Sequence, residues 1–559
     1  MVGLARFVTS CLLATPSRNP CCCRRSLTTV SLASASRSSS SRSSNTNSGN
    51  RKKKFQQSFK KKQNQDQEPR RSKSKFKSSG GKPHLHNRNQ KRQPKNTRTP
   101  PEVTSIPALT SINGPLPTFF SCRHGYEEPL MEEIQRAVSG NDHLQITSPC
   151  PGLVQVLSPS DETEISQRVS SMRPIYALQS IPNCHIIRAE SIGKLTSSVL
   201  QVLQLNADSS SDDISGIAQS LDQAESLSIH GLVPGMFKGQ TDPIWNRRVN
   251  TIANQVQEKL ASRFACARRK RRQVIEDDDG DDSSRKQDHW LLQLLLFSPE
   301  VMAVSLTKSN APEDASFFLP WPNSKYPAGL PNVDIQDSMP SSAYRKLLEA
   351  LECCSVLPPH SDDEQSTDYP IVDLGACPGG WTKALRLLGC RVLAVDRSPL
   401  RDDLMKDPFV EFVTGDAFTF QPPWAEEQTD IPSEPIPNTW MVSDVIAYPE
   451  RVAELLSQWC GSKWASNMIV TAKFQGSSIP WQALEDAEAI AKKYGYQCRI
   501  QHFFNNKHEV TVMLSHPCGK GENESSAGRD AIKERWNLVS QPLLGKPTYP
   551  ATLGYSLAL

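Results

Sequence analysis

Short apolar runs bounded by charged or glycine residues recur in the second half of the chain. They occupy residues 369–374, 391–396, 439–444, 468–473 and 509–514. Runs of this kind are typical of strands that are buried on both faces of a sheet. Apolar residues at helical spacing accompany them at 341–354 and 381–389. Strands that alternate with helices in this way predict a doubly wound α/β sheet.

The region before this sheet has a looser pattern of short strands and helices. Strand-like runs lie at 118–123, 153–157, 175–180 and 226–232, and helical patterns lie at 125–134, 195–203 and 245–274. Residues 289–296 and 301–307 predict a hairpin around Ser298-Pro-Glu300. We therefore expect an α+β region over 115–330 and the doubly wound domain over 331–520, with the boundary in the Pro- and Asn-containing segment 320–340.

A glycine turn connects the first strand of the predicted sheet to its helix, in Ile371-Val-Asp-Leu-Gly-Ala-Cys-Pro-Gly-Gly-Trp381. Glycines there let a ligand approach the backbone, and the helix N-terminus offers free N–H donors. Asp396 ends the next strand about 20 residues later, the usual place for an acid that holds ribose hydroxyls. The turn predicts a nucleoside-binding corner. A nicotinamide-type corner and a plain structural turn stay open, although Cys377 breaks the G-x-G-x-x-G pattern.

Charge is distributed unevenly along the 559 residues. Residues 1–100 hold 24 Lys or Arg and 2 Asp or Glu, whereas the whole chain has a net charge of +5, so the remainder is acidic. This asymmetry indicates a nucleic-acid partner for the N-terminal arm. The 15 cysteines include no C-x-x-C pair, so neither a zinc ribbon nor a disulfide framework is indicated. No apolar run is long enough to span a membrane, and we expect no metal.

The N-terminus has the composition of a targeting segment. Residues 1–48 contain no Asp or Glu and are rich in Ser and Arg, which is typical of an organellar transit peptide. An ordinary disordered tail and a secretory signal are the alternatives, and the latter lacks an adequate apolar core. Residues 49–114 form a basic low-complexity arm that we expect to be disordered and to contact RNA. A solvated linker or a nuclear-localisation signal would also explain the basic runs.

The motif Asp373-Leu-Gly-Ala-Cys-Pro-Gly-Gly-Trp381 resembles motif I of FtsJ-type S-adenosylmethionine-dependent RNA ribose 2′-O-methyltransferases. Within this family, the chain resembles the RlmM-type enzymes, which methylate a cytidine ribose in large-subunit rRNA. The likeness covers about 115–516 and is strongest over 340–514. It implies a Rossmann-like methyltransferase sheet preceded by a THUMP-like region that helps to bind RNA. The basic arm, an acidic loop insert at 274–288 and a Pro/Glu-rich insert at 421–438 depart from this pattern, and residues 521–559 form a tail.

The resemblance also implies a catalytic tetrad of Lys, Asp, Lys and Glu. The matching residues are Lys346, Asp444, Lys473 and Glu509, in the same order along the chain. Lys473 would accept the proton of the ribose 2′-hydroxyl, the carboxylates would orient the lysines, and Lys346 would help to hold the ribose or its phosphate. Asp444 and Lys473 end predicted strands, and open α/β sheets bind ligands at that edge.

The cofactor-binding residues are also assigned by the resemblance. They are Asp373, Gly375, Cys377, Pro378, Gly379, Gly380, Trp381, Asp396, Asp416 and Asp444. The turn residues would wrap the methionine part of S-adenosylmethionine, Asp396 would bind the ribose, and Asp416 would contact the adenine amine. A turn-capping role is the alternative for Asp416, because aspartate often caps turns.

We therefore expect an organellar enzyme, in chloroplast or mitochondrion, that methylates a ribose 2′-hydroxyl of large-subunit rRNA. Another RNA substrate, or a nuclear or cytoplasmic location, is an alternative. A non-catalytic RNA-binding or ribosome-assembly factor with a methyltransferase fold is a second hypothesis, and binding without turnover would favour it. An NAD(P)-dependent oxidoreductase is a third, and a cofactor-binding assay would test it.

Overall fold

The computed structural model describes residues 116–519. It leaves out 139–143, 158–162, 204–214, 235–242, 269–288, 310–316, 320, 323–324, 332, 334, 360–368, 427–429 and 477 within that range. The expected transit peptide, basic arm, acidic insert and C-terminal tail lie outside the described residues. What the sequence predicts for those segments therefore stays a prediction.

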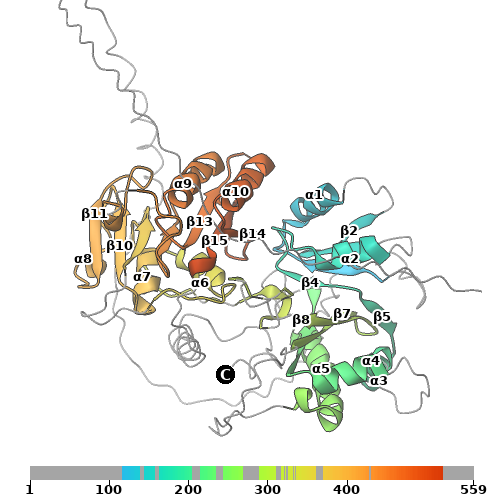
Figure 1. The fold of residues 1–559 in the computed structure, drawn as a ribbon. Coiled ribbons are helices and arrows are strands. Elements are labelled where there is room, and N and C mark those ends of the chain that lie inside the picture. Colours follow the sequence, from blue (N-terminus) through green and yellow to red (C-terminus); the bar gives the residue numbers. More distant parts are fainter. Residues whose placement is uncertain are drawn as a thin grey trace, which may run out of the picture. The chain divides into compact units, whose positions relative to one another are not determined.

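A seven-stranded sheet forms the centre of the C-terminal domain, residues 339–519 (Figure 1). Its strands are β9 Ile371–Leu374, β10 Val392–Asp396, β11 Val410–Thr414, β12 Trp440–Ser443, β13 Asn467–Lys473, β14 Gln497–Gln501 and β15 Glu509–Ser515. They lie in the order β11-β10-β9-β12-β13-β15-β14. The first five of these are parallel, and β15 runs antiparallel to both of its neighbours. The predicted doubly wound sheet is thus confirmed, with an antiparallel pair added at one edge.

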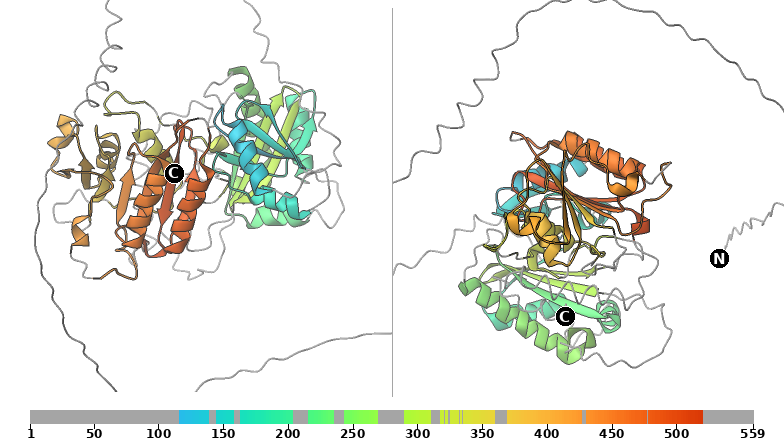
Figure 2. Two further views of the ribbon diagram at one scale, coloured as in Figure 1. Left: turned by 90° about the horizontal axis from the view of Figure 1, so that it is seen from above. Right: turned by 90° about the vertical axis from the view of Figure 1, so that its left-hand side faces the viewer.

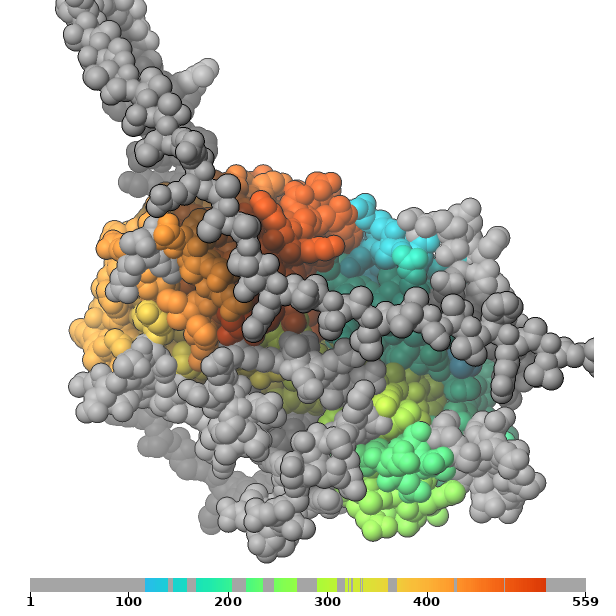
Figure 3. Space-filling model, in the orientation of Figure 1, coloured from blue at the N-terminus to red at the C-terminus, as the bar shows by residue number. Residues whose placement is uncertain are grey.

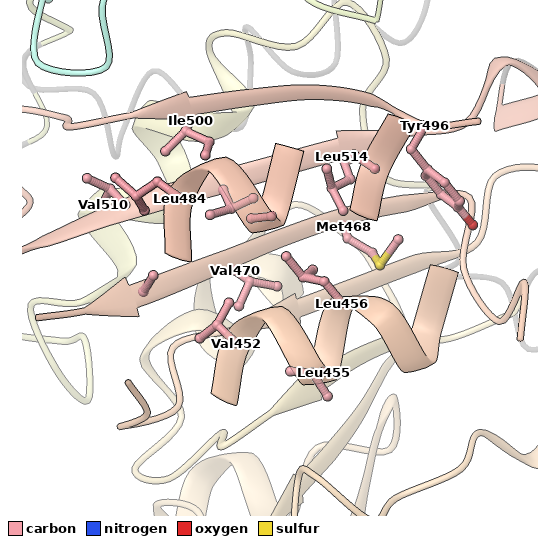
Figure 4. Packing of buried hydrophobic residues seen from close by; sticks show 14 of the residues in the cluster. Val452, Leu455, Leu456, Met468, Val470, Leu484, Tyr496, Ile500, Val510 and Leu514 are labelled. Carbon is pink, nitrogen blue, oxygen red and sulfur yellow. The ribbon is translucent and has the colours of Figure 1, made fainter. Parts of the chain in front are cut away.

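Helices cover both faces of this sheet, which explains why its strands are apolar on both sides. Helices α9 Pro449–Gly461 and α10 Trp481–Lys493 cover one face, and α6 Tyr344–Leu351 and α7 Gly380–Leu387 cover the other. The short helix α8 Asp402–Met405 follows β10. Neighbouring residues of a strand belong to opposite clusters, as Val372 and Ile371 do. Figure 4 shows Leu456 of α9 beside Met468 and Val470 of β13.

The region before this domain contains two four-stranded sheets. This region is coloured blue to yellow-green in two further ribbon views (Figure 2) and in the space-filling view (Figure 3). The first sheet has the order β2-β3-β1-β4, and the second has the order β5-β8-β7-β6. Their strands are β1 Thr118–Ser121, β2 Gln145–Cys150, β3 Leu153–Leu157, β4 Gln179–Ile181, β5 His185–Arg188, β6 Ser226–Leu232, β7 His289–Ser298 and β8 Val301–Ser309. The helices are α1 Glu127–Ala137, α2 Thr163–Ser171, α3 Ile192–Val202, α4 Ser215–Gln223 and α5 Pro243–Arg263. The predicted α+β architecture and the hairpin β7–β8 are therefore present.

Two predicted elements of this region were wrong in their extent. Residues 175–178 are not strand, because the carboxylate of Glu133 accepts the backbone N–H groups of Ile175, at 2.6 Å, and Tyr176, at 3.1 Å. Only β4 remains of the predicted strand. The helix expected over 245–274 ends at Arg263, since Phe264 has an extended backbone with φ −112° and ψ 135°. A 3₁₀ turn at Ala265–Ala267 follows it.

Candidate active site

Four charged side chains from four different elements meet at one edge of the C-terminal sheet. The ammonium of Lys346 lies 2.7 Å from Asp444 Oδ1 and 3.1 Å from Glu509 Oε1. The ammonium of Lys473 lies 3.2 Å from the same Asp444 oxygen and donates to the backbone oxygen of Asp444 at 2.6 Å. The structure thus brings together the four residues that the sequence singled out. Their catalytic roles stay predictions.

Strand register places three members of this tetrad at the same edge. Asp444 follows the last residue of β12, and Lys473 is the last residue of the neighbouring parallel strand β13. Glu509 begins β15, but this strand is antiparallel, so Glu509 pairs directly with Lys473. A strand start and two strand ends therefore meet where open α/β sheets bind their ligands.

The loop between β14 and β15 fixes the approach to Glu509. The backbone N–H of Asn505 donates to Glu349 of α6 at 3.0 Å, and the N–H of His502 donates to the Ile175 carbonyl at 2.7 Å. The hydroxyl of Tyr126 donates to the Lys507 carbonyl at 2.5 Å. This loop is therefore attached both to the helix that carries Lys346 and to the segments that precede α1 and β4.

Thr471 is a site residue that the sequence reasoning missed. Its hydroxyl donates to Asp444 Oδ1 at 2.6 Å, and its side chain is fully buried. Asp444 Oδ1 thus contacts three groups, namely this hydroxyl and the two lysine ammoniums. The sequence contained a signal for this residue, because Thr471 lies two residues before Lys473 and therefore on the same face of β13.

The glycine turn and the helix that carries Lys346 are held together. The indole N–H of Trp381 donates to the carbonyl of Ala343, just before α6, at 2.9 Å. A Cβ on Gly380 would lie 2.1 Å from the Ser341 hydroxyl oxygen, so only glycine permits this approach. Trp381 is 2% exposed, so its indole packs in the interior beneath the turn. These contacts therefore fix the position of the helix that carries Lys346 relative to the glycine turn.

Two other turn glycines are required by backbone conformation. Gly375 has φ +75° and Gly379 has φ +105°, both in the region that L side chains rarely adopt. A Cβ on Gly375 would lie 2.9 Å from the Cα of Val445, in the loop after Asp444. The turn therefore lies directly against the loop that leads from the tetrad. The partly exposed Cys377 and the exposed Pro378 occupy the turn between the two glycines.

Carboxylates at the ends of β10 and β11 flank this turn. Asp396 accepts the N–H of Cys377 at 3.0 Å and the N–H of Ser398 at 2.8 Å. Asp416 accepts the N–H of Phe418 at 2.9 Å and pairs with Arg397, and these two contacts hold the pKa of the Asp416 carboxyl below its ordinary value. Asp416 therefore caps a turn, the alternative that the sequence left open. An ionised carboxylate has further acceptor positions, so neither residue is excluded from binding a ligand.

Asp373 differs from these acids because it is 1% exposed. Burial, together with the nearby charges of Asp444 and Asp396, raises the pKa of its carboxyl to about 7, although the hydroxyl of Thr382 donates to it at 2.6 Å. Asp373 thus connects β9 to α7 beneath the turn. Its part in cofactor binding stays a prediction, and its contact with Thr382 supports the turn.

The tetrad, the glycine turn and the flanking acids form one site that suits a nucleoside cofactor and a polar acceptor. Glycines bring the backbone close to the site, and carboxylates can accept hydrogen bonds from hydroxyl and amino groups. Among the described residues, no group of three or more His, Cys, Asp or Glu could hold a metal ion. None of the helices in the described part of the chain is both long and apolar enough to cross a membrane.

Residues 339–442 match the model of the family described as FtsJ-like methyltransferase. The glycine turn, Lys346 and the flanking acids lie within this match, and Asp444 lies two residues beyond its end. Residues 339–442 of the C-terminal domain are therefore similar to FtsJ-like methyltransferases, and S-adenosylmethionine is the methyl donor of that class. The residues at the turn fit this cofactor, since the turn has no side chains at its glycines and acids lie at or just after the ends of two adjacent strands.

Within that class, the chain is similar to proteins named Ribosomal RNA large subunit methyltransferase M. The one from Halorhodospira halophila is 32% identical over 194 residues, which are 34% of this chain and 51% of that protein. The one from Laribacter hongkongensis is 30% identical over 234 residues, or 41% of this chain and 60% of that protein. The chain spans about half the length of the curated relatives that it matches.

Solved structures give matches of low score. The magnesium protoporphyrin IX methyltransferase of Synechocystis, with bound SAM, has a TM-score of 0.19 and 14% identity, and the match covers 26% of this chain and 69% of that one. Trm5b of Pyrococcus abyssi has a TM-score of 0.20 and 9% identity over 71% of this chain and 98% of that one. Scores of this size support no conclusion, so the description of the fold rests on the strand order itself.

Proposed function

We propose that the protein transfers a methyl group from S-adenosylmethionine to the 2′-hydroxyl of a cytidine ribose in organellar large-subunit rRNA. The observation that carries this proposal is the contact of Lys346, Asp444, Lys473 and Glu509 at the edge that also holds the glycine turn. The relatives' names, which specify large-subunit rRNA, support the choice of RNA.

The proposed reaction is an in-line displacement. S-adenosylmethionine supplies, when bound, a methyl group on a sulfonium sulfur, which is a good leaving group because it departs as a neutral thioether. The ribose O2′ forms the bond to the methyl carbon as the carbon–sulfur bond breaks, and the hydroxyl proton must be removed. The chain has to orient the hydroxyl and take that proton. Orientation can contribute several kcal/mol, and a placed base contributes about 10²–10⁴-fold.

We assign the proton to Lys473 because of its accessibility, and the side chain must be in its neutral amine form to accept that proton. The side chain of Lys473 is 24% exposed, whereas that of Lys346 is 7% exposed and lies between two carboxylates. A ribose can therefore approach Lys473 more readily than Lys346. Lys346 orients Asp444 and Glu509, and Asp444 holds Lys473 through both its carboxylate and its carbonyl oxygen.

The segments outside the methyltransferase domain are assigned to RNA binding and targeting. The α+β region at 115–330 would act as the THUMP-like RNA-binding half, and the basic arm at 49–114 would add non-specific contacts to phosphates. Residues 1–48 would direct the protein to chloroplast or mitochondrion. The support for these assignments is the resemblance of the chain and the composition of its N-terminus.

A ribose-methylation map of organellar large-subunit rRNA tests the proposal. Cells that lack the protein are complemented with the parent chain, with Lys473→Ala or with Lys492→Ala. Lys492 is an exposed lysine at the last turn of α10 and is the matched control. We expect cells without the protein to lose one 2′-O-methyl group. The parent chain and the Lys492→Ala control should restore it, whereas Lys473→Ala should not.

An unchanged map would contradict the proposed substrate. If purified protein still binds S-adenosylmethionine, the same map of tRNA and mRNA would follow. Binding of RNA without methylation of any of these would favour the non-catalytic assembly factor.

A further inference from the structure

Two large apolar side chains are exposed beside the tetrad, in the loop that joins β12 to α9. Ile446 is 89% exposed and Tyr448 is 50% exposed. Single exposed apolar residues are common on protein surfaces. These two, however, lie two and four residues after Asp444, at the edge where the substrate must bind.

The loop presents both side chains on the same side. Residues alternate between buried and exposed, because Ala447 between them is 8% exposed and Pro449 after them is buried. Tyr448 has the extended backbone angles φ −74° and ψ 157°, so the chain is not yet helical at this residue. Ile446 and Tyr448 therefore face outward together.

The backbone beneath these side chains is fixed to the tetrad. The N–H of Lys473 donates to the carbonyl of Ala447 at 3.3 Å, and the Lys473 ammonium donates to the carbonyl of Asp444 at 2.6 Å. At the other end, the carbonyl of Tyr448 accepts the N–H of Val452 in the first turn of α9 at 3.0 Å. The two exposed side chains thus stand on a rigid support next to Lys473.

We propose that Ile446 and Tyr448 form a platform that contacts the base of the target nucleotide. The inference rests on the proposed function, which places a ribose hydroxyl at Lys473. The base is attached to the same ribose, so it must lie within one nucleoside of this lysine. A base that leaves its stack regains contact on aromatic and apolar side chains. The platform offers an aromatic ring and a branched aliphatic side chain at that place.

The platform positions the substrate and takes no part in proton transfer. Stacking is tolerant of base identity, because every base has an apolar face. We therefore expect the platform to strengthen binding of the flipped nucleotide, while the rest of the RNA-binding region selects the site. S-adenosylmethionine binding should not depend on it.

Steady-state methylation of an RNA fragment that contains the mapped nucleotide tests the platform. Ile446→Ala and Tyr448→Ala should each raise KM for RNA by about 5- to 150-fold, the range that corresponds to loss of one stacking contact. Tyr448→Phe keeps the ring and should stay within about twofold of the parent. Leu387→Ala and Tyr369→Ala change exposed apolar residues at the opposite edge of the sheet, 41% and 37% exposed, and should leave KM unaltered.

A fluorescent cytidine analogue at the target position gives an independent readout. Its emission should change when the parent protein binds the fragment, and this change should be lost in Tyr448→Ala. The inference is overturned if the parent methylates the fragment while both alanine variants keep KM within about twofold. A parent protein that binds S-adenosylmethionine but methylates no RNA overturns the proposed function, and the platform with it.

Discussion

Replacing Thr471 by valine removes one hydroxyl from beneath the tetrad and keeps the branched shape of the side chain. The hydroxyl donates to Asp444 Oδ1 at 2.6 Å in a fully buried position. A hydrogen bond to a charged group contributes about 1.5–3 kcal/mol. Asp444 Oδ1 keeps two lysine contacts, at 2.7 and 3.2 Å, so we expect the lower end of this range. A loss of about 1.5 kcal/mol in the transition state lowers kcat about tenfold.

The chain offers a matched control directly opposite this residue. Thr511 pairs with Thr471 across β13 and β15 and is equally buried, but its hydroxyl contacts Asn506 at 3.3 and 3.4 Å instead of Asp444. Thr471→Val should lose about 1.5 kcal/mol of unfolding free energy, since its partner is charged, and Thr511→Val about 1 kcal/mol, the usual value for a neutral hydrogen bond. Only Thr471→Val should lose kcat, and Thr471→Ser, which keeps the hydroxyl, should recover most of it.

Single-turnover methylation and urea unfolding of the same preparations separate the two effects. Affinity for S-adenosylmethionine should stay at the parent value in all three variants. The positioning role of Thr471 is refuted if Thr471→Val keeps kcat within about twofold of the parent, or if Thr511→Val loses as much activity as Thr471→Val.

Three other substitutions test the supports of the site. Lys346→Met leaves two facing carboxylates without their shared cation, so it should abolish methylation and lower the unfolding free energy in urea by about 3 kcal/mol. Gly379→Ala should destabilise the chain by about 1–3 kcal/mol, and by more than Gly476→Ala in the same assay. Both glycines have positive φ, but only at Gly379 does the new Cβ meet another side chain, that of Leu404. Burial raises the pKa of Glu349 from 4.5 to about 8, against the nearby charges of Arg345 and Arg123, so the folded chain keeps a proton that the unfolded chain releases. Stability should therefore fall by up to about 1.4 kcal/mol per pH unit between these values, and unfolding of Glu349→Gln across pH 5–8 should show a flatter dependence.

The elements that the sequence predicts well are those whose signal is local. The strands before Asp444 and at Lys473 show as short apolar runs, and the glycine turn shows through its composition. The hairpin β7–β8 is predicted for the same reason, since two apolar runs flank a short turn. Each signal needs only a few neighbouring residues, so no knowledge of the tertiary structure is required.

The elements that the sequence predicts poorly depend on distant groups. The strand expected at 175–180 loses its first half because Glu133, about 40 residues earlier, accepts its backbone N–H groups. Burial raises the pKa of the Glu133 carboxyl to about 7. The residues around Glu133 in the sequence do not indicate that this acid is buried. Likewise, the antiparallel direction of β15 follows from its pairing with β13 and β14 and not from its own residues.

The same difference between local and distant signals applies to the residues of the candidate site. Asp444 and Lys473 could be placed at one edge from the sequence, because parallel strands end together. Glu509 could not, since it begins a strand, and only the antiparallel register brings it opposite Lys473. Lys346 reaches the site from α6, whose position depends on the contact of Trp381 with the Ala343 carbonyl.

The burial of the tetrad argues against a role in stability alone. Lys346 and Glu509 are 7% and 8% exposed at their side chains, so folding removes both charges from water. The attraction within a buried ion pair commonly does no more than offset this desolvation, and apolar residues of similar size are often equally or more stabilising. A chain that needed only the fold could therefore dispense with all four charges at little cost. The more exposed Lys473 makes the same point, because its ammonium is held at the surface of the cluster, 2.6 Å from the Asp444 carbonyl, where a substrate hydroxyl can reach it. The cluster is thus better explained by a reaction at Lys473 than by the stability of the sheet that carries it.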